Sequence, residues 1–168
     1  VQTFYLFTML LAFLKEICRY RYTPYIAYFA FAVGDYLVGS RYSRYYSALP
    51  QEFGLIFLFP CAIALIHFFR AVRDENAEYK RMKQQKLLYT RIDGRKRWRE
   101  STIWLWVLII SFGLTLSAHF YITIVAGLLV VAAAVAYIRY LFNLKTLRRL
   151  ACAALLSLLI PIFPMAVS

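Results

Sequence analysis

Residues 101–138 read STIWLWVLIISFGLTLSAHFYITIVAGLLVVAAAVAYI, a run of 38 residues without Asp, Glu, Lys or Arg. One straight helix of this length would measure about 57 Å, whereas the hydrocarbon core of a bilayer is about 30 Å thick. The run is therefore predicted to cross a membrane twice and to turn at Ser117-Ala118-His119. We predict an all-helical, polytopic integral membrane protein.

The composition of the whole chain agrees with this prediction. Hydrophobic residues make up 62% and charged residues 17% of the 168 residues, against about 45–50% and about 25% in soluble domains. The chain is long enough for about six spans of about 20 residues. The predicted spans, in a single membrane domain, are 1–14, 22–40, 53–69, 102–117, 120–138 and 150–167.

Two of these spans are less regular than the others. Residues 1–14 would measure only about 21 Å as a helix, and we expect a real span there because no basic residue precedes it and no small-residue cleavage site follows it. Pro60 is expected to kink the third span. Pro161 and Pro164 leave two interpretations of the last segment open, a complete span or a bent, re-entrant one.

Positive charge predicts the orientation of the six spans, because cytoplasmic loops retain Lys and Arg. The first, third and fifth connections hold 18 of the basic residues, and the other side holds only Arg41 and Arg44. Both termini are therefore expected outside the cytoplasm. No organelle presequence is recognisable, which favours a bacterial inner membrane.

The connection 70–100 is the only polar segment of any size, with eleven basic and five acidic residues. Its first part, from Ala71 to Ile92, has no Pro or Gly and is predicted to be helical. The cationic residues proposed to contact anionic lipid headgroups or a partner are Lys80, Arg81, Lys83, Lys86, Arg95, Lys96, Arg97 and Arg99. Two interpretations stay open: a cluster that sets topology and anchors the next span, or a docking site for an acidic partner or a phosphorylated lipid.

Asp35 is the one acid inside a predicted span, and charged residues in hydrocarbon are candidates for function. It could pair with Arg41 or Arg44 at the outer interface, or it could relay a proton or cation. Nearby, Ala30 and Gly34 have the small-xxx-small spacing that lets another helix approach closely. Gly113 and Gly127 are further candidates for helix packing.

Motifs for catalysis, metal binding or nucleic-acid binding are absent from the sequence. It has no glycine-rich phosphate loop, His/Glu metal motif or nucleophile elbow, and no catalytic residue, metal or cofactor is predicted. His67 and His119 should lie at opposite ends of the spans, too far apart to share a haem or metal. The Arg-Tyr runs at 19–22 and 41–46 face opposite sides, which indicates an interfacial belt rather than a nucleic-acid surface. Cys18, Cys61 and Cys152 are expected to be packing residues.

A thin set of polar groups within the spans and a rich set at the interfaces favour a role in assembly. We expect a non-enzymatic subunit or accessory component of a larger membrane complex, whose spans pack on other subunits or on a second copy. The alternative is a small transporter or oligomeric channel with three spans in each of two inverted halves. In that alternative Asp35 would couple transport to an ion or proton.

Overall fold

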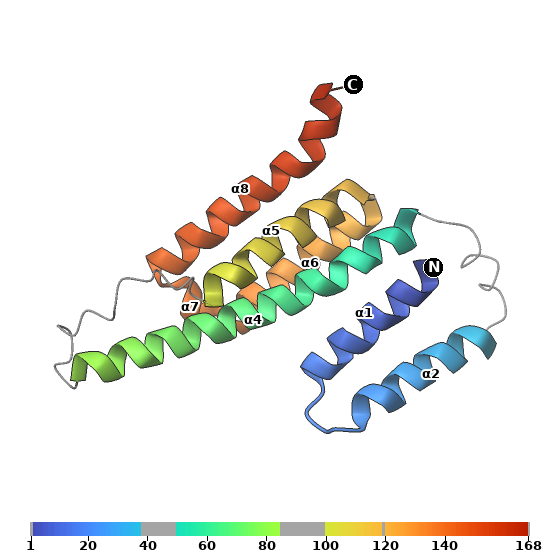
Figure 1. Cartoon of the computed structure of the whole chain (residues 1–168), viewed down its shortest axis with the longest axis horizontal. Coiled ribbons are helices and arrows are strands. Elements are labelled where there is room, and N and C mark those ends of the chain that lie inside the picture. Colours follow the sequence, from blue (N-terminus) through green and yellow to red (C-terminus); the bar gives the residue numbers. More distant parts are fainter. Residues whose placement is uncertain (1, 38–49, 85–99, 119, 168) are drawn as a thin grey trace.

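The computed structural model describes residues 2–37, 50–84, 100–118 and 120–167, which form helices joined by short turns (Figure 1). No strand occurs within these segments, so the prediction of an all-helical chain is confirmed. In chain order the helices are α1 (Gln2–Ile17), α2 (Thr23–Leu37), α4 (Pro50–Gln84), α5 (Glu100–Ala118), α6 (Phe120–Ala136), α7 (Ile138–Leu141) and α8 (Leu144–Val167).

The helix boundaries follow the predicted spans closely at most positions. The long uncharged run is broken where the turn was predicted, since α5 ends at Ala118 and α6 begins at Phe120; His119 itself lies outside the described residues. The last helix continues past Pro161 to Val167. The prolines therefore do not end α8, although Figure 1 shows a bend near its C-terminus.

The third predicted span and the predicted loop helix form one continuous helix, α4, of 35 residues. No Pro or Gly occurs between Cys61 and Gln84, so nothing in the local sequence ends the helix where charge begins. Pro60 is accommodated within it. The C-terminal part of α4 extends past the neighbouring helices (Figure 1). The predicted end of this helix at Ile92 falls outside the described residues.

Two helices in the described segments, Gly54–Ala77 and Glu100–Ala118, are long and apolar enough to cross a membrane. Helices α1, α2 and α6 contain 16, 15 and 17 residues and are shorter than a full span. Six spans are therefore not confirmed.

The core lies between α4 and α5. The face of α4 that carries Cys61, Leu65, Phe68 and Val72 is buried, and these positions recur at the spacing of one side of a helix. Leu108 of α5 completes the same cluster. Helix α8 packs on α5, and α6 contacts both α4 and α5. The inner helices of the molecule are thus α4 and α5.

Two glycines allow the helices to approach closely at the end of the bundle opposite the charged residues. A Cβ on Gly113 of α5 would lie 2.9 Å from the Ser157 carbonyl oxygen and 2.9 Å from Ile160 Cβ, both on α8. A Cβ on Gly54 of α4 would lie 2.9 Å from Ile122 Cγ1 on α6. Side chains at these two positions would separate the helices.

Helices α1 and α2 form a hairpin at the side of this bundle. In Figure 1 the hairpin lies below α4, with α2 outermost, and α8 lies on the opposite side of α4 and α5. Helix α1 packs on α4, whereas α2 packs mainly on α1. The hairpin begins its second helix at Thr23, with Pro24 in the first turn, where its missing N–H costs little.

Candidate functional site

The charged end of the bundle holds a set of polar contacts between helices. Arg70 Nη1 on α4 donates a hydrogen bond of 2.8 Å to Glu16 Oε2 in the last turn of α1. His67 Nε2 lies 3.1 Å from the same oxygen, and the His67 ring stacks on Trp104 of α5 with a centroid distance of 4.3 Å. Arg70 Nη2 also donates to the Glu16 carbonyl at 3.3 Å. Glu16 therefore joins the hairpin to α4.

A second group of contacts surrounds the first turn of α5. Glu75 Oε1 on α4 accepts a hydrogen bond of 3.2 Å from the Ser101 backbone N–H. This contact satisfies one of the unpaired donors at a helix N-terminus and places a negative charge at the positive end of the helix dipole. The N-terminus of α5 is thus capped from a different helix.

Arg149 of α8 contacts the same turn from the other side. Its Nη1 donates to Ser101 Oγ at 2.9 Å and its Nη2 donates to Thr102 Oγ1 at 2.9 Å. Its guanidinium carbon lies 5.5 Å from the centroid of the Phe68 ring. Ser101 and Phe68 are fully buried, so the charged head of Arg149 is held against the core by hydrogen bonds and by the ring face.

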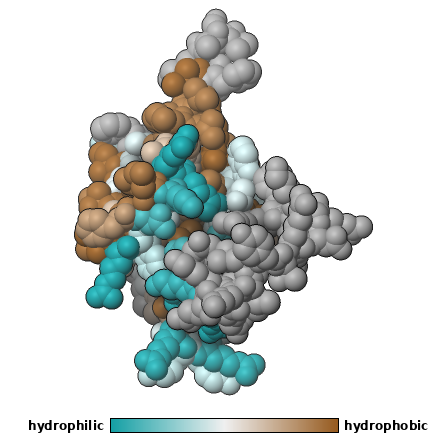
Figure 2. Space-filling model, turned by 90° about the vertical axis from the view of Figure 1, so that its left-hand side faces the viewer, coloured by the Kyte–Doolittle hydropathy of each residue, from teal (hydrophilic) through white to brown (hydrophobic). Residues whose placement is uncertain are grey.

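Most remaining cations at this end face outward. Arg139, Lys145 and Arg148 are exposed on α7 and α8, and within the described residues no carboxylate lies at ion-pair distance from any of them. No Asp or Glu occurs after Glu100 in the sequence. Figure 2 views the molecule from this end and shows hydrophilic side chains gathered on it, with the apolar surface of α8 rising above them.

The basic residues selected from the sequence are only partly covered by the described residues. Lys80 and Arg81 are exposed near the end of α4, which extends past the other helices. Lys83 lies in the last turn of α4, and nothing is described of its side chain. Lys86, Arg95, Lys96, Arg97 and Arg99 lie outside the described residues. Contact of this group with lipid or a partner stays a prediction.

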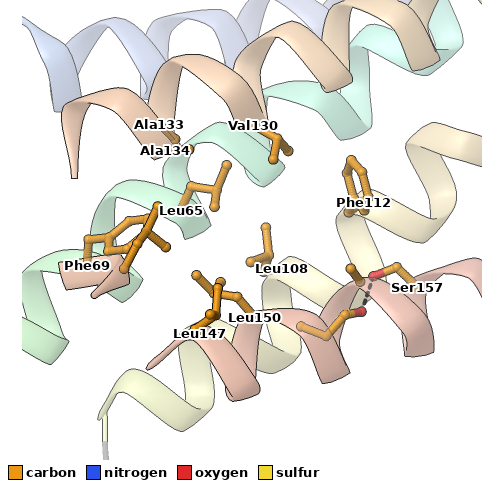
Figure 3. Close-up of a pocket in the computed structure, with 13 residues that line it drawn as sticks. Leu65, Phe69, Leu108, Phe112, Val130, Ala133, Ala134, Leu147, Leu150 and Ser157 are labelled. Carbon is orange, nitrogen blue, oxygen red and sulfur yellow. Dashed lines mark hydrogen bonds between the residues drawn. The ribbon is translucent and has the colours of Figure 1, made fainter. Parts of the chain in front are cut away.

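An apolar groove lies between α6 and α8 (Figure 3). Its volume is about 340 Å³. The floor of the groove is formed by Leu65 and Phe69 of α4 and by Leu108 and Phe112 of α5. One wall consists of Val130, Ala133 and Ala134 of α6, and the other consists of Leu147, Leu150, Ala153, Ala154 and Ser157 of α8. Leu141 of α7 lies at the charged end of the groove. The Ser157 hydroxyl lies 2.8 Å from the Ala153 carbonyl oxygen and 3.1 Å from the Ile109 carbonyl oxygen. The lining is therefore apolar throughout.

The four small residues proposed for helix packing lie in different surroundings. Gly113 is buried against α8 within the chain. A Cβ on Gly34 or Gly127 would have no atom within 4 Å, and Ala30 is exposed on the outermost helix. Packing of these three against another chain stays a prediction. Asp35 lies in the last turn of α2, its side chain is outside the described part, and so are Arg41 and Arg44.

The hydroxyl groups and histidines fill structural roles where they are described. Ser111 donates to the Val107 carbonyl at 2.7 Å, and Thr115 donates to the Ser111 carbonyl at 2.7 Å, which is the usual way in which Ser and Thr bond back along a helix. His67 contacts Glu16, while His119 is not among the described residues. Within the described segments no group of three or more His, Cys, Asp or Glu is placed to hold a metal ion.

Glu16, Glu75 and Arg149 were not among the site residues predicted from the sequence. A usable signal existed for Glu16, which is the only acid in the first 34 residues and stands beside Lys15 at the end of a span. Arg149 gave no comparable signal, because Arg148 beside it is exposed and has the same chemistry. Comparison of the chain with protein-family models, with curated proteins and with solved structures found no match.

Proposed function

We propose that this chain is a polytopic membrane protein that acts as a non-catalytic subunit or accessory component of a larger membrane complex. The observation that carries the proposal is the apolar outer surface of α2, α6 and α8. Large hydrophobic side chains stand exposed along all three helices, among them Phe29 on α2, Leu128 and Val131 on α6, and Leu155 and Leu159 on α8. Surfaces of this kind require lipid or other helices as neighbours.

The partial burial of the two helices that are long and apolar enough to cross a membrane supports a membrane location. Half of the apolar window in α4 and a third of that in α5 are buried within the molecule. The core helix of a soluble protein would be buried over most of its length, because water would penalise the remaining apolar surface. The outward side chains of α5, including Trp106 and Ile110, favour hydrocarbon as their solvent.

The directions of the helices support six crossings. Glu16, Arg70, Ser101 and Arg149 meet at one end, whereas Gly113 meets Ile160 at the other. Successive long helices therefore run in opposite directions, as Figure 1 also shows, and the described Lys and Arg residues lie at or beyond one end. By the positive-inside rule, we propose that this end faces the cytoplasm and that both termini lie on the other side of the membrane. The proposed membrane is a bacterial inner membrane.

The short α1–α2 hairpin supports assembly in particular. Helices of 16 and 15 residues measure about 24 and 22 Å, less than a hydrocarbon core of about 30 Å. Such short spans are stabilised when neighbouring helices shield their ends. Among the described residues α2 packs mainly on α1, which leaves the face with Ala30 and Gly34 available to a partner helix in our proposal.

The transporter alternative is less well supported by the arrangement of the helices. If two inverted halves were related by an internal twofold axis, the contact of α4 with α5 would be matched by a contact of α8 with α1. In Figure 1, α8 and α1 lie on opposite sides of α4 and α5. The arrangement of the helices therefore favours assembly over transport.

Affinity purification from native membranes in a mild detergent, after cross-linking, tests the proposed function. A defined set of membrane proteins should co-purify with the chain. Substitution of Ala30 and Gly34 by Leu should reduce the recovery of these proteins. The matched pair Leu128→Ala and Val131→Ala tests whether the exposed face of α6 also contacts a partner. A monomer that purifies alone and carries measurable ion flux in liposomes would overturn the proposal. Loss of that flux in Asp35→Asn would then favour the transporter.

The proposed topology has its own test. Single cysteines introduced at Arg19 and Lys145, in a chain whose Cys18, Cys61 and Cys152 are replaced by Ser or Ala, should react with a membrane-impermeant thiol reagent only from the cytoplasmic side. A cysteine at Ser43 should react only from the opposite side. Labelling of Ser43→Cys and Lys145→Cys from the same compartment would contradict six crossings.

A further inference from the structure

We infer that the groove between α6 and α8 holds an acyl chain of an anionic phospholipid, with the phosphate headgroup at the end where Arg139, Lys145 and Arg148 are exposed. This inference rests on the proposed membrane location. It adds a defined lipid site, formed by residues outside the basic segment 80–99.

The length of the groove fits a chain from one leaflet. On α8 the lining runs from Leu147 to Ser157, eleven residues whose ten intervals span about 15 Å along the helix axis. This is half of a hydrocarbon core of about 30 Å. The groove begins beside Leu141, next to the charged end, so it covers the depth that an acyl chain reaches from a headgroup on that side.

The connection at the charged end of the groove favours a linear chain over a helix. At the charged end α7 connects α6 to α8 directly, and Leu141 of α7 lies in the lining. A helix from another chain would have to displace this connection.

The chemistry of the lining excludes a polar ligand along its length. Among the described residues that line the groove, Ser157 is the only one with a polar side chain, and its hydroxyl already lies at hydrogen-bond distance from the carbonyl oxygens of Ala153 and Ile109. In the two walls, the side chains of Val130, Leu147 and Ala154 are exposed. The groove is therefore open on the side that faces hydrocarbon in the proposed topology.

Charge at the mouth of the groove favours an anionic headgroup over a zwitterionic one. The three exposed cations have no ion-pair partner among the described residues, and no acid follows Glu100 in the sequence. Arg149 is already held by Ser101 and Thr102, so it is not counted among them. Basic residues at the cytoplasmic end of neighbouring membrane helices attract anionic lipid.

The experiment uses the full chain reconstituted in phosphatidylcholine nanodiscs with photoreactive phosphatidylglycerol that carries a diazirine near the middle of one acyl chain. Adducts should map to residues of the groove on α6 and α8. Ala154→Trp should fill the groove and reduce these adducts about tenfold, whereas the matched change Ala151→Trp, on α8 outside the lining, should leave them unchanged. Adducts confined to other helices, or equal yields from the two variants, would overturn the inference.

A second pair of variants tests the headgroup without changing the packing. Lys145→Gln with Arg148→Gln should lower the adduct yield on the order of tenfold, and Arg19→Gln with Arg21→Gln, at the same end on the hairpin, should not. Equal labelling by photoreactive phosphatidylcholine would overturn the assignment of an anionic lipid.

A third measurement identifies any other occupant of the groove. A photoreactive phenylalanine at Leu147 should capture phospholipid in native membranes, and capture of a polypeptide would overturn the inference in favour of a partner helix. Membrane extraction separates this result from the proposed function. A chain that remains membrane-bound without lipid in the groove refutes only this inference, and a chain that is released refutes both.

Discussion

Two regions of the molecule are held in place by different kinds of contact. The first region consists of α4, α5 and α8, and the second is the hairpin of α1 and α2. In the first region glycine allows close backbone approach, and side chains such as Phe68 and Leu108 are buried. The hairpin is held by Glu16 at one end and by the stacked rings of Phe13 and Phe59, whose centroids are 5.6 Å apart.

This difference predicts where the molecule is stable and where it adapts. Regions with few buried apolar contacts open at lower free energy than the core. The hairpin is therefore the part whose position lipid or a partner can alter at least cost, while α4, α5 and α8 form the scaffold. The following substitutions test the two regions separately.

Arg149→Ala should have the largest effect because it breaks the scaffold at the start of α5. The change removes two hydrogen bonds from a charged donor and leaves the buried Ser101 hydroxyl without that partner, which we expect to cost about 3 kcal/mol of unfolding free energy. The measurement is unfolding in mixed detergent micelles. The neighbouring Arg148→Ala, at an exposed site, should change stability by less than about 0.5 kcal/mol, and equal effects would refute the distinction.

Gly113→Ala should have the next largest effect, also within the scaffold. The added Cβ would meet the Ser157 carbonyl and Ile160 on α8, and overpacking of this kind costs about 1–3 kcal/mol. The matched change Gly127→Ala meets no atom within 4 Å and should be neutral or stabilising, because Ala is the better helix former. A thermal unfolding midpoint lowered only in Gly113→Ala is the expected result; equal midpoints would argue against close packing of α5 and α8.

Glu16→Gln should have the smallest effect, and the effect should be local. The side chains of Glu16 and Arg70 are partly exposed, so the loss of charge should cost about 1 kcal/mol. Hydrogen exchange should rise in α1 and α2 and stay unchanged in α5. Asp74→Asn, which alters the exposed pair with Arg73, is the control and should change neither. Increased exchange throughout the molecule would contradict the separation into two regions.

The prediction from sequence was most accurate where a local property decides the structure. The break between the end of α5 at Ala118 and the start of α6 at Phe120 follows from the length of an uncharged run. The prediction was less accurate at α4, where charge was taken as a boundary. Charged residues favour water over lipid around a helix, but they do not end the helix. A segment without Pro or Gly therefore continues as a helix from the apolar part of α4 into its charged part.

Contacts between distant residues could not be predicted in the same way. The pairing of Glu16 with Arg70 joins positions 54 residues apart, and Arg148 and Arg149 differ only in the side of α8 on which they lie. The groove likewise requires α6 and α8 to be placed on the same floor of α4 and α5.

By itself the sequence determined that the chain is helical, where most helices begin and end, and at which end the positive charge collects. These properties depend on runs of residues and on the length of a helix, which are local quantities. Only the tertiary structure decided which arginine is held against the core, which glycine is in a close contact and where an apolar groove opens. Those properties depend on the rotation of each helix about its axis and on its choice of neighbours, which are set by the packing of the whole chain.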